Sequence, residues 1–303
     1  MAATTQIAER TSEPPRLRVG RRLRELRAYR EVLLNLVRKE LKVKYAASVL
    51  GAVWSLLNPI VFLAVFTFVT RVLGNNVPDY PVYLLSGLLA WNLFSTSLTT
   101  GARSVLDNAN LVKKVAFPRE ILPLAGIGVA LVDYVLQMGV LLLFIVVSGY
   151  GFHLPDLALF PLAFLALLSF TLAVTFWVAA LNVRYRDVQH LLNVALLVWF
   201  WGSPIVYATA LVQGKAAGKT FLGIPLFDIY FLNPLAGILE GIHRALYAIV
   251  TPIVDGQPVP VLADVSLGWL AAVLGAITLL SLVMLRFTWG YFFDRSGDFA
   301  EEL

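Results

Sequence analysis

The stretch Asn108–Pro123, which reads NANLVKKVAFPREILP, decides how this chain can be arranged. It is short, polar and basic, and it separates two apolar segments that are too long for ordinary core helices. Four cations lie within it or just before it, namely Arg103, Lys113, Lys114 and Arg119. Because such cations gather in short loops on the cytoplasmic side of a membrane, the stretch is predicted to be a cytoplasmic loop between two spans.

Within this loop, apolar residues at helical spacing predict a helix that lies along the membrane surface. These residues are Leu106, Leu111, Val112 and Val115. Phe117 and Pro118 are expected to end the helix, because proline disfavours a helical residue before it. A helix placed in this way can contact a soluble partner.

The composition is that of an integral membrane protein. Of the 303 residues, 59% are apolar and 14% are charged, and the mean hydropathy is +0.77. A soluble protein carries about 25% charged residues. Cysteine is absent, which excludes disulfides and thiolate metal sites. The three histidines are scattered and have no carboxylates at ligand spacing, so no metal site is predicted.

The first part of the chain is basic. Twelve of the 24 Lys and Arg residues precede residue 52, which favours an anionic lipid surface or an acidic partner over nucleic acid. Residues 1–18 have no periodicity and are expected to be disordered. Residues 19–52 are predicted to form an amphipathic helix at the membrane interface, with the alternative that the helix is solvated and packs on a partner.

The remaining sequence predicts an all-α, polytopic membrane protein with about six transmembrane helices. The spans are expected near residues 53–73, 82–100, 121–147, 160–181, 191–211 and 266–286. They form one transmembrane domain over residues 53–286, followed by a tail over residues 287–303. This scheme puts 20 cations on one side and four on the other, which predicts that both termini are cytoplasmic.

Residues 227–250 precede the last span and are too interrupted for a full crossing. They contain Asn233 and Pro234, followed by apolar residues at helical spacing, which favours re-entrant helices. Glu240 and Arg244 stand four residues apart, so they could pair on one helix face.

Few residues suggest catalytic or ligand chemistry. The segment Gly214–Thr220 is similar to a phosphate-binding loop, but it has three residues between its glycines instead of four, and no strand is predicted before it. Asp133 lies in the middle of the third predicted span, with Gln137 one turn later. Three interpretations of Asp133 remain open: a functional intramembrane carboxylate, a third span that starts later than residue 121, or a carboxylate that only hydrogen-bonds a neighbouring helix.

Several segments taken in order resemble a known family. They are Lys42–Tyr45, Ser48–Gly51, Trp54, Pro59, Tyr83–Trp91, Asn110–Pro123, Asn182–Val188, Ser203–Tyr207 and Asn233–Leu235. Together they resemble the ABC-2 type permeases that export polysaccharides and polyol phosphates, and the resemblance extends from about Tyr29 to Tyr291.

The resemblance implies a homodimer of six-span subunits in the bacterial cytoplasmic (inner) membrane. A separate nucleotide-binding ATPase would dock on the cytoplasmic face and bind ATP and Mg, and this chain would hold no cofactor, metal or catalytic residue of its own. The substrate would be a lipid-linked polysaccharide, either O-antigen-like, galactan or teichoic-acid-like, and the chain would also contact membrane lipids but no nucleic acid.

The resemblance also suggests roles for particular residues. The coupling helix would run from Ser104 to Arg119, with ATPase-coupling residues Leu111, Lys113, Lys114, Val115, Phe117, Pro118, Arg119 and Glu120. The outer gate would include Asn233, Pro234, Glu240 and Arg244. Residues Arg184, Arg186 and Asp187 would form a second loop on the inner face.

Three alternatives are weighed against this interpretation. A drug or lipid exporter of the same superfamily would share the coupling stretch, but would not need an aromatic conduit for sugars. A membrane glycosyltransferase would need catalytic carboxylates or a metal site, which the sequence does not suggest. A proton-coupled secondary transporter would make Asp133 indispensable. Co-purification with an ATPase would separate the two exporters from the other classes.

Overall fold

The structure, a computed structural model, describes residues 19–45, 53–72, 77–248, 251, 253–254 and 257–303. Among these residues, four helical segments are long and apolar enough to cross a membrane. They contain α4 (Tyr80–Asp107), α6 (Ile121–Val147), α8 (Phe160–Arg184) with the short α7 (Leu154–Leu157) before it, and α13 (Leu267–Arg295). The apolar helices α3 (Val53–Val72) and α9 (Val188–Trp201) accompany them. The predicted polytopic all-α fold is confirmed.

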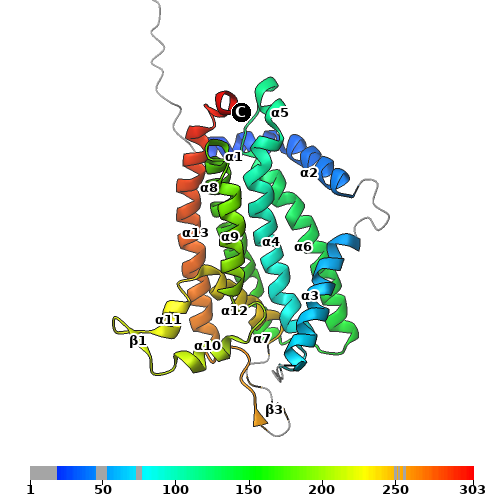
Figure 1. Cartoon of the computed structure of the whole chain (residues 1–303), viewed down its shortest axis with the longest axis vertical. Coiled ribbons are helices and arrows are strands. Elements are labelled where there is room, and N and C mark those ends of the chain that lie inside the picture. The colour runs from blue at the N-terminus through cyan, green and yellow to red at the C-terminus, as the bar shows by residue number, and fades with distance from the viewer. Residues whose placement is uncertain (1–18, 46–52, 73–76, 249–250, 252, 255–256) are drawn as a thin grey trace, which may run out of the picture.

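The long helices run roughly parallel, so the molecule has two distinct ends (Figure 1). One end carries α1 (Val19–Ala28), α2 (Arg30–Tyr45), α5 (Ala109–Lys114) and the C-terminus after α14 (Phe299–Glu302). We call it the terminal end. The opposite end, here the loop end, carries α7, α10 (Thr209–Ala216), α11 (Leu226–Tyr230) and two short hairpins.

The hairpins pair two-residue strands in antiparallel register. In the first, β1 (Thr220–Phe221) pairs with β2 (Ile224–Pro225). In the second, β3 (Ile253–Val254) pairs with β4 (Gln257–Pro258). The stretch similar to a phosphate loop includes the last turn of α10 and reaches β1, so a helix precedes it rather than the strand that a phosphate loop requires.

α4 is the central helix of the fold, with α6 and α8 packed along it. Small residues allow α4 and α6 to approach closely, since a Cβ added at Gly126 would lie 3.0 Å from the backbone nitrogen of Gly101. Phe94 and Leu98 of α4 are fully buried in the main apolar core. α13 packs along the other side of α8.

The basic arm forms two helices where the sequence predicted one over residues 19–52. A turn at Tyr29 separates α1 from α2. α2 lies against α6, and a Cβ added at Gly128 would come within 2.8 Å of the Val37 side chain. The apolar face of α2 therefore packs on another helix of the same chain. Residues 46–52 of the predicted helix and the predicted tail over residues 1–18 lie outside the described residues.

The fifth predicted span, over residues 191–211, is not one helix. α9 ends at Trp201, and the segment Gly202–Ala208 separates it from α10. Pro204 cannot continue the backbone ladder of α9, and Gly202 is a poor helix former, so the chain leaves the helix there. With 14 residues, α9 is ~21 Å long, which is shorter than the hydrocarbon core of a membrane.

The last helix is longer than predicted. The sequence placed its end at residue 286 and assigned residues 287–303 to a tail, but α13 continues to Arg295. Trp289 and Phe292 explain the extension, because both are buried in a second core cluster at the terminal end. α14 follows after a short turn, and Phe299 packs edge-on against Phe292.

α12 (Pro234–Leu246) is a buried helix that does not cross the whole protein. Its 13 residues span ~20 Å, and it packs against α4, α8 and α13 near the loop end. α11 and α12 are two short helices in the segment where the sequence predicted re-entrant helices.

Candidate coupling site

The family resemblance implied one coupling helix from Ser104 to Arg119, but the basic stretch between α4 and α6 does not form a single helix. α4 ends at Asp107, and α5 covers only Ala109–Lys114. Asn108 separates the two helices with φ −111° and ψ 26°. After α5 the backbone becomes extended at Val115, with φ −128° and ψ 133°, which ends the helix three residues before Pro118.

α5 has one buried side and one exposed side. Val112 is buried in the core cluster at the terminal end, and Leu111 packs against that cluster while remaining partly exposed. Lys113 and Lys114 are exposed, and the Val115 side chain is 51% exposed. Of Leu111 and Val115, the two aliphatic residues expected to couple to the ATPase, Val115 is thus the more accessible to a partner.

The chain enters α6 through Phe117, Pro118 and Arg119. Phe117 is partly buried against the terminal-end cluster, and Pro118 is buried. The Pro118 carbonyl accepts a hydrogen bond from the amide of Ile121, the first residue of α6, at 3.1 Å. Arg119 is partly buried, and this burial lowers the pKa of its guanidinium, while the nearby Asp298 opposes that change. The position of α5 is therefore tied closely to the start of α6.

Glu120 is the centre of a buried polar network at this junction. Its side chain is 0% exposed, and it accepts two hydrogen bonds from Arg22, from Nε at 2.7 Å and from Nη2 at 2.6 Å. The indole Nε1 of Trp289 also donates to Glu120, at 3.3 Å. Arg22 donates a further hydrogen bond to Glu25 at 2.6 Å, and its guanidinium lies 4.9 Å from the centre of the Phe293 ring.

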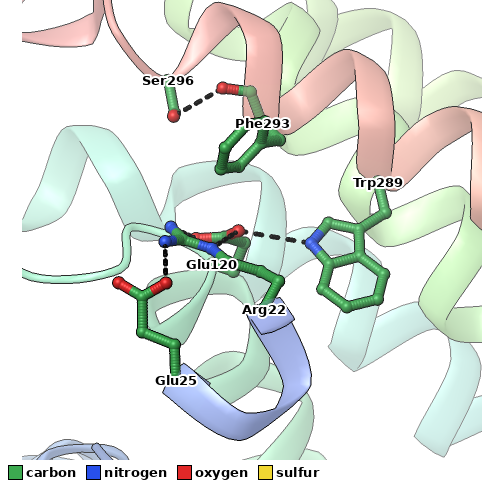
Figure 2. A network of polar contacts seen from close by, with 6 residues as sticks. All are labelled: Arg22, Glu25, Glu120, Trp289, Phe293 and Ser296. Atoms are coloured by element: carbon green, nitrogen blue, oxygen red, sulfur yellow. Dashed lines mark hydrogen bonds and ion pairs between the residues drawn. The ribbon is translucent and has the colours of Figure 1, made fainter. Parts of the chain in front are cut away.

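These five residues, which we call the Glu120 network, connect three separate parts of the fold (Figure 2). Arg22 and Glu25 come from α1, Glu120 precedes α6, and Trp289 and Phe293 come from α13. Burial opposes the charge on Arg22, yet its pKa is raised overall because of its hydrogen bonds and attraction to Glu120 and Glu25. A bidentate arginine–carboxylate pair fixes both distance and orientation. Movement of the coupling stretch is thereby linked to α1 and α13.

The second predicted inner loop is also at the terminal end and is exposed. α8 ends at Arg184 and α9 begins at Val188, so Arg186 and Asp187 lie in the tight turn between them. Arg184, Arg186 and Asp187 are all exposed. The amide of Asn182 donates to the carbonyl of Ala102 at 2.9 Å, which anchors this turn to α4.

Asp133 is paired with the end of the basic arm. Lys44 Nζ lies 2.5 Å from one carboxylate oxygen, and the Tyr45 hydroxyl donates to the other at 2.6 Å. The Asp133 carboxylate therefore bonds to a neighbouring helix, as one interpretation of the sequence predicted. α6 begins at Ile121, so the span does not start later than predicted. A functional role for Asp133 stays a prediction. Gln137 is buried one turn further along α6.

At the loop end, Asn233 joins α9 to α12. Its side-chain oxygen accepts from the Leu235 amide, which caps α12, and from the indole of Trp199 at 2.8 Å. Its amide nitrogen donates to Ser203 at 3.1 Å. Pro234 occupies the first turn of α12, where proline is well tolerated. These two predicted gate residues therefore form the start of α12 and connect it to α9.

The predicted pair of Glu240 and Arg244 is wrong. Arg244 Nε donates to Asp156 of α7 at 2.8 Å. Glu240 instead accepts from the Thr209 hydroxyl at 2.5 Å and from the Ala263 amide at 2.8 Å. Both residues have tertiary partners with better geometry than a neighbour on the same helix.

The observed pairing predicts which second mutation rescues a change at Arg244. Arg244→Gln leaves the buried Asp156 without its cation and should destabilise the protein by about 3 kcal/mol. Adding Asp156→Asn should restore most of that stability, because the unpaired charge is removed, whereas adding Glu240→Gln should not. Thermal unfolding of the purified single and double variants measures this difference. Equal rescue by both second mutations would contradict the assignment.

Sequence reasoning found Glu120 and Asp133 but not their partners. Arg22 is separated from Glu120 by 98 positions, and Lys44 from Asp133 by 89. One available signal was the position of Glu120, a carboxylate in an otherwise basic loop. A charge placed there needs a cation from elsewhere when the loop is buried.

The chain was compared with known proteins. Residues 31–247 match the family described as ABC-2 type transporter. A protein of Myxococcus xanthus named O-antigen export system permease protein RfbA is 35% identical over 248 residues, which cover 81% of this chain and 91% of that protein. A protein of the same name from Klebsiella pneumoniae is 30% identical over 210 residues, covering 69% of this chain and 77% of that protein. By this match over most of its transmembrane region, the chain belongs to the ABC-2 type transporter family.

Proposed function

We propose that this chain is the membrane subunit of an exporter that moves a lipid-linked polysaccharide across the cytoplasmic membrane. The cargo class follows from the relatives, which are named O-antigen export permeases. Within that class the cargo is O-antigen-like, galactan or teichoic-acid-like. Energy comes from a separate ATPase subunit, which binds ATP and Mg.

One observation carries the coupling part of the proposal. The exposed residues Lys113–Ala116 end four positions before Glu120, whose network reaches α1 and α13. A partner that pushed on this exposed segment would move the start of α6 through Pro118 and Glu120. Packed helices respond to such a push by shifting as units, which is how a docking event reaches a transport path.

The proposal includes the orientation and the assembly. The terminal end would face the cytoplasm, supported by the excess of cations predicted for that side. Two copies of the chain would form a homodimer, with one ATPase bound to the terminal end of each copy. α11 and α12 would form the outer gate, held by Asn233 at its junction with α9.

The orientation is tested by cysteine labelling, because the chain has no cysteine of its own. Arg184 and Lys215 are both exposed, the first at the terminal end and the second in α10 at the loop end. In intact cells, an impermeant thiol reagent should label Lys215→Cys and spare Arg184→Cys. Disrupting the cells should make Arg184→Cys reactive, which controls for its accessibility. The reverse pattern in intact cells would contradict the orientation.

The cargo is tested by deleting the gene from its host. We expect surface polysaccharide to disappear and lipid-linked polysaccharide to accumulate inside the cell, and both effects should be reversed by the intact gene. A drug or lipid exporter would leave the surface polysaccharide unchanged. The energy source is tested in the deletion strain that carries a tagged copy of the gene, where the tagged chain should co-purify with an ATPase.

A further inference from the structure

A polar cavity lies in the membrane-embedded part of the chain, where α2, α3, α4 and α6 meet. Its volume is about 190 Å³, and its polar lining includes Asn58, Asn92, Thr96, Asp133, Tyr134 and Gln137. Asp133 is twelve residues beyond the start of α6, and this separation corresponds to ~18 Å along the helix. The cavity therefore lies about halfway along α6, where the end of α2 reaches it.

The polar groups of this cavity are held in place by the fold. Lys44 and Tyr45 fix the two oxygens of the Asp133 carboxylate. The Tyr134 side chain is only 3% exposed, and its ring stacks on Phe164 with 5.4 Å between centroids. The Tyr134 hydroxyl is buried and makes no hydrogen bond within the described part of the chain. A buried hydroxyl without a partner costs about 1–3 kcal/mol, so a ligand or water is expected to satisfy it.

The charge of the cavity limits the kind of ligand. Lys44 and Asp133 both line it, and they neutralise each other at 2.5 Å. Such a site offers no net attraction to a phosphate or to a metal ion. The remaining groups are amides and hydroxyls, which donate and accept hydrogen bonds equally well. A neutral ligand rich in hydroxyl groups matches this lining.

A second cavity extends the first toward the terminal end. It measures about 300 Å³ and lies between α2, α4 and α6, with Lys44 lining both cavities. Thr100 lines the second cavity and Thr96 the first, one turn apart on α4. The two cavities therefore follow the same α4–α6 interface, and the end of α2 lies at their junction.

We propose that the deeper cavity binds one sugar ring of the transported glycan. This inference rests on the proposed function and adds a site to it. The volume equals that of ~six water molecules in the liquid, so water is the competing occupant. Sugar hydroxyls would replace those waters with little loss of hydrogen bonding, which suits a site that must release its cargo.

The first test labels a cysteine inside the cavity. Thr96→Cys is expressed with a hydrolysis-deficient partner ATPase, so that glycan is retained, and membranes are treated with a small charged thiol reagent. The probe is the cell's own lipid-linked glycan, present in one strain and absent in another that lacks the first glycosyltransferase of its synthesis. We expect labelling in the glycan-free membranes and about tenfold slower labelling when glycan is present, as a site worth one or two hydrogen bonds predicts. Lys215→Cys, at the loop end, should label equally in both.

The second test measures export when one cavity amide is changed. Asn92→Leu should reduce surface glycan about tenfold at an unchanged membrane level of the protein, and Asn92→Gln should retain most export because it keeps the amide. Equal labelling of Thr96→Cys with and without glycan means that water alone fills the cavity and overturns the inference. No labelling in either strain, or normal export by Asn92→Leu, overturns it as well. If gene deletion leaves surface glycan intact, the proposed function itself fails, a result distinct from these.

Discussion

Arg22→Leu is expected to be among the most damaging single substitutions in this chain. The change leaves the Glu120 carboxylate fully buried, and among the described residues only the indole of Trp289 still donates to it. Removing one partner of a buried ion pair costs about 3–5 kcal/mol, because the other charge stays away from water. We expect a lower melting temperature of the purified protein, a lower amount in the membrane and loss of surface polysaccharide.

A matched control separates this effect from the loss of one positive charge. Arg21→Leu makes the same chemical change one position earlier in α1, where the side chain is exposed. It should leave both stability and export close to those of the wild type. The double variant Arg22→Leu and Glu120→Leu should recover much of the stability, because no buried charge remains, but it should not recover export if the Glu120 network transmits movement. If Arg22→Leu behaves like Arg21→Leu, the network has no structural role.

The same network illustrates what the sequence could not predict. The family resemblance placed Glu120 among the ATPase-coupling residues, but it did not predict that this carboxylate is the centre of a buried polar network. Its partner Arg22 is one of twelve cations in the N-terminal arm, and nothing local distinguishes it from Arg21 or Arg24. Only the fold brings α1 next to the start of α6.

The error at Arg244 has a different cause. The spacing of Glu240 and Arg244 is favourable on a solvated helix, where neighbours four apart are each other's nearest partners. α12 is instead surrounded by other helices, so each charged group meets groups from elsewhere in the chain. Asp156 approaches Arg244 from α7, and Glu240 is satisfied by Thr209 and Ala263. The spacing rule for exposed helices therefore predicted a pair between Glu240 and Arg244 that does not form on this buried helix.

Helix boundaries were predictable where the length of the apolar run and the residues that flank it indicated the same start and end. The third span was predicted over residues 121–147, and α6 covers Ile121–Val147. Pro118 and Glu120 mark its start, and Ser148 and Gly149 mark its end. The fifth span failed because apolar residues continue through Gly202–Ala208, so hydropathy gave no sign of the break that Pro204 and Gly202 impose.

Val115→Asp is expected to release the partner ATPase from the permease. The Val115 side chain is 51% exposed and directly follows Lys113 and Lys114, so it is the accessible apolar group of this segment. Apolar groups near the centre of an interface carry much of the binding energy, and a loss of about 2 kcal/mol weakens binding ~30-fold. Co-purification of the ATPase with the tagged permease should fall accordingly, and export should fall with it.

Two control variants assign this loss to the apolar contact. Asn110→Asp adds the same negative charge to an exposed position of α5 without removing an apolar side chain, so it should weaken binding much less. Lys113→Gln with Lys114→Gln should slow association and weaken its dependence on salt concentration, because exposed lysines steer an approach more than they hold a complex. Insertion should survive in that double variant, since Arg103 and Arg119 would still hold the loop on the side proposed to be cytoplasmic. If Val115→Asp retains its ATPase and exports normally, the partner docks elsewhere, and the exposed loop of Arg184, Arg186 and Asp187 becomes the surface to change next.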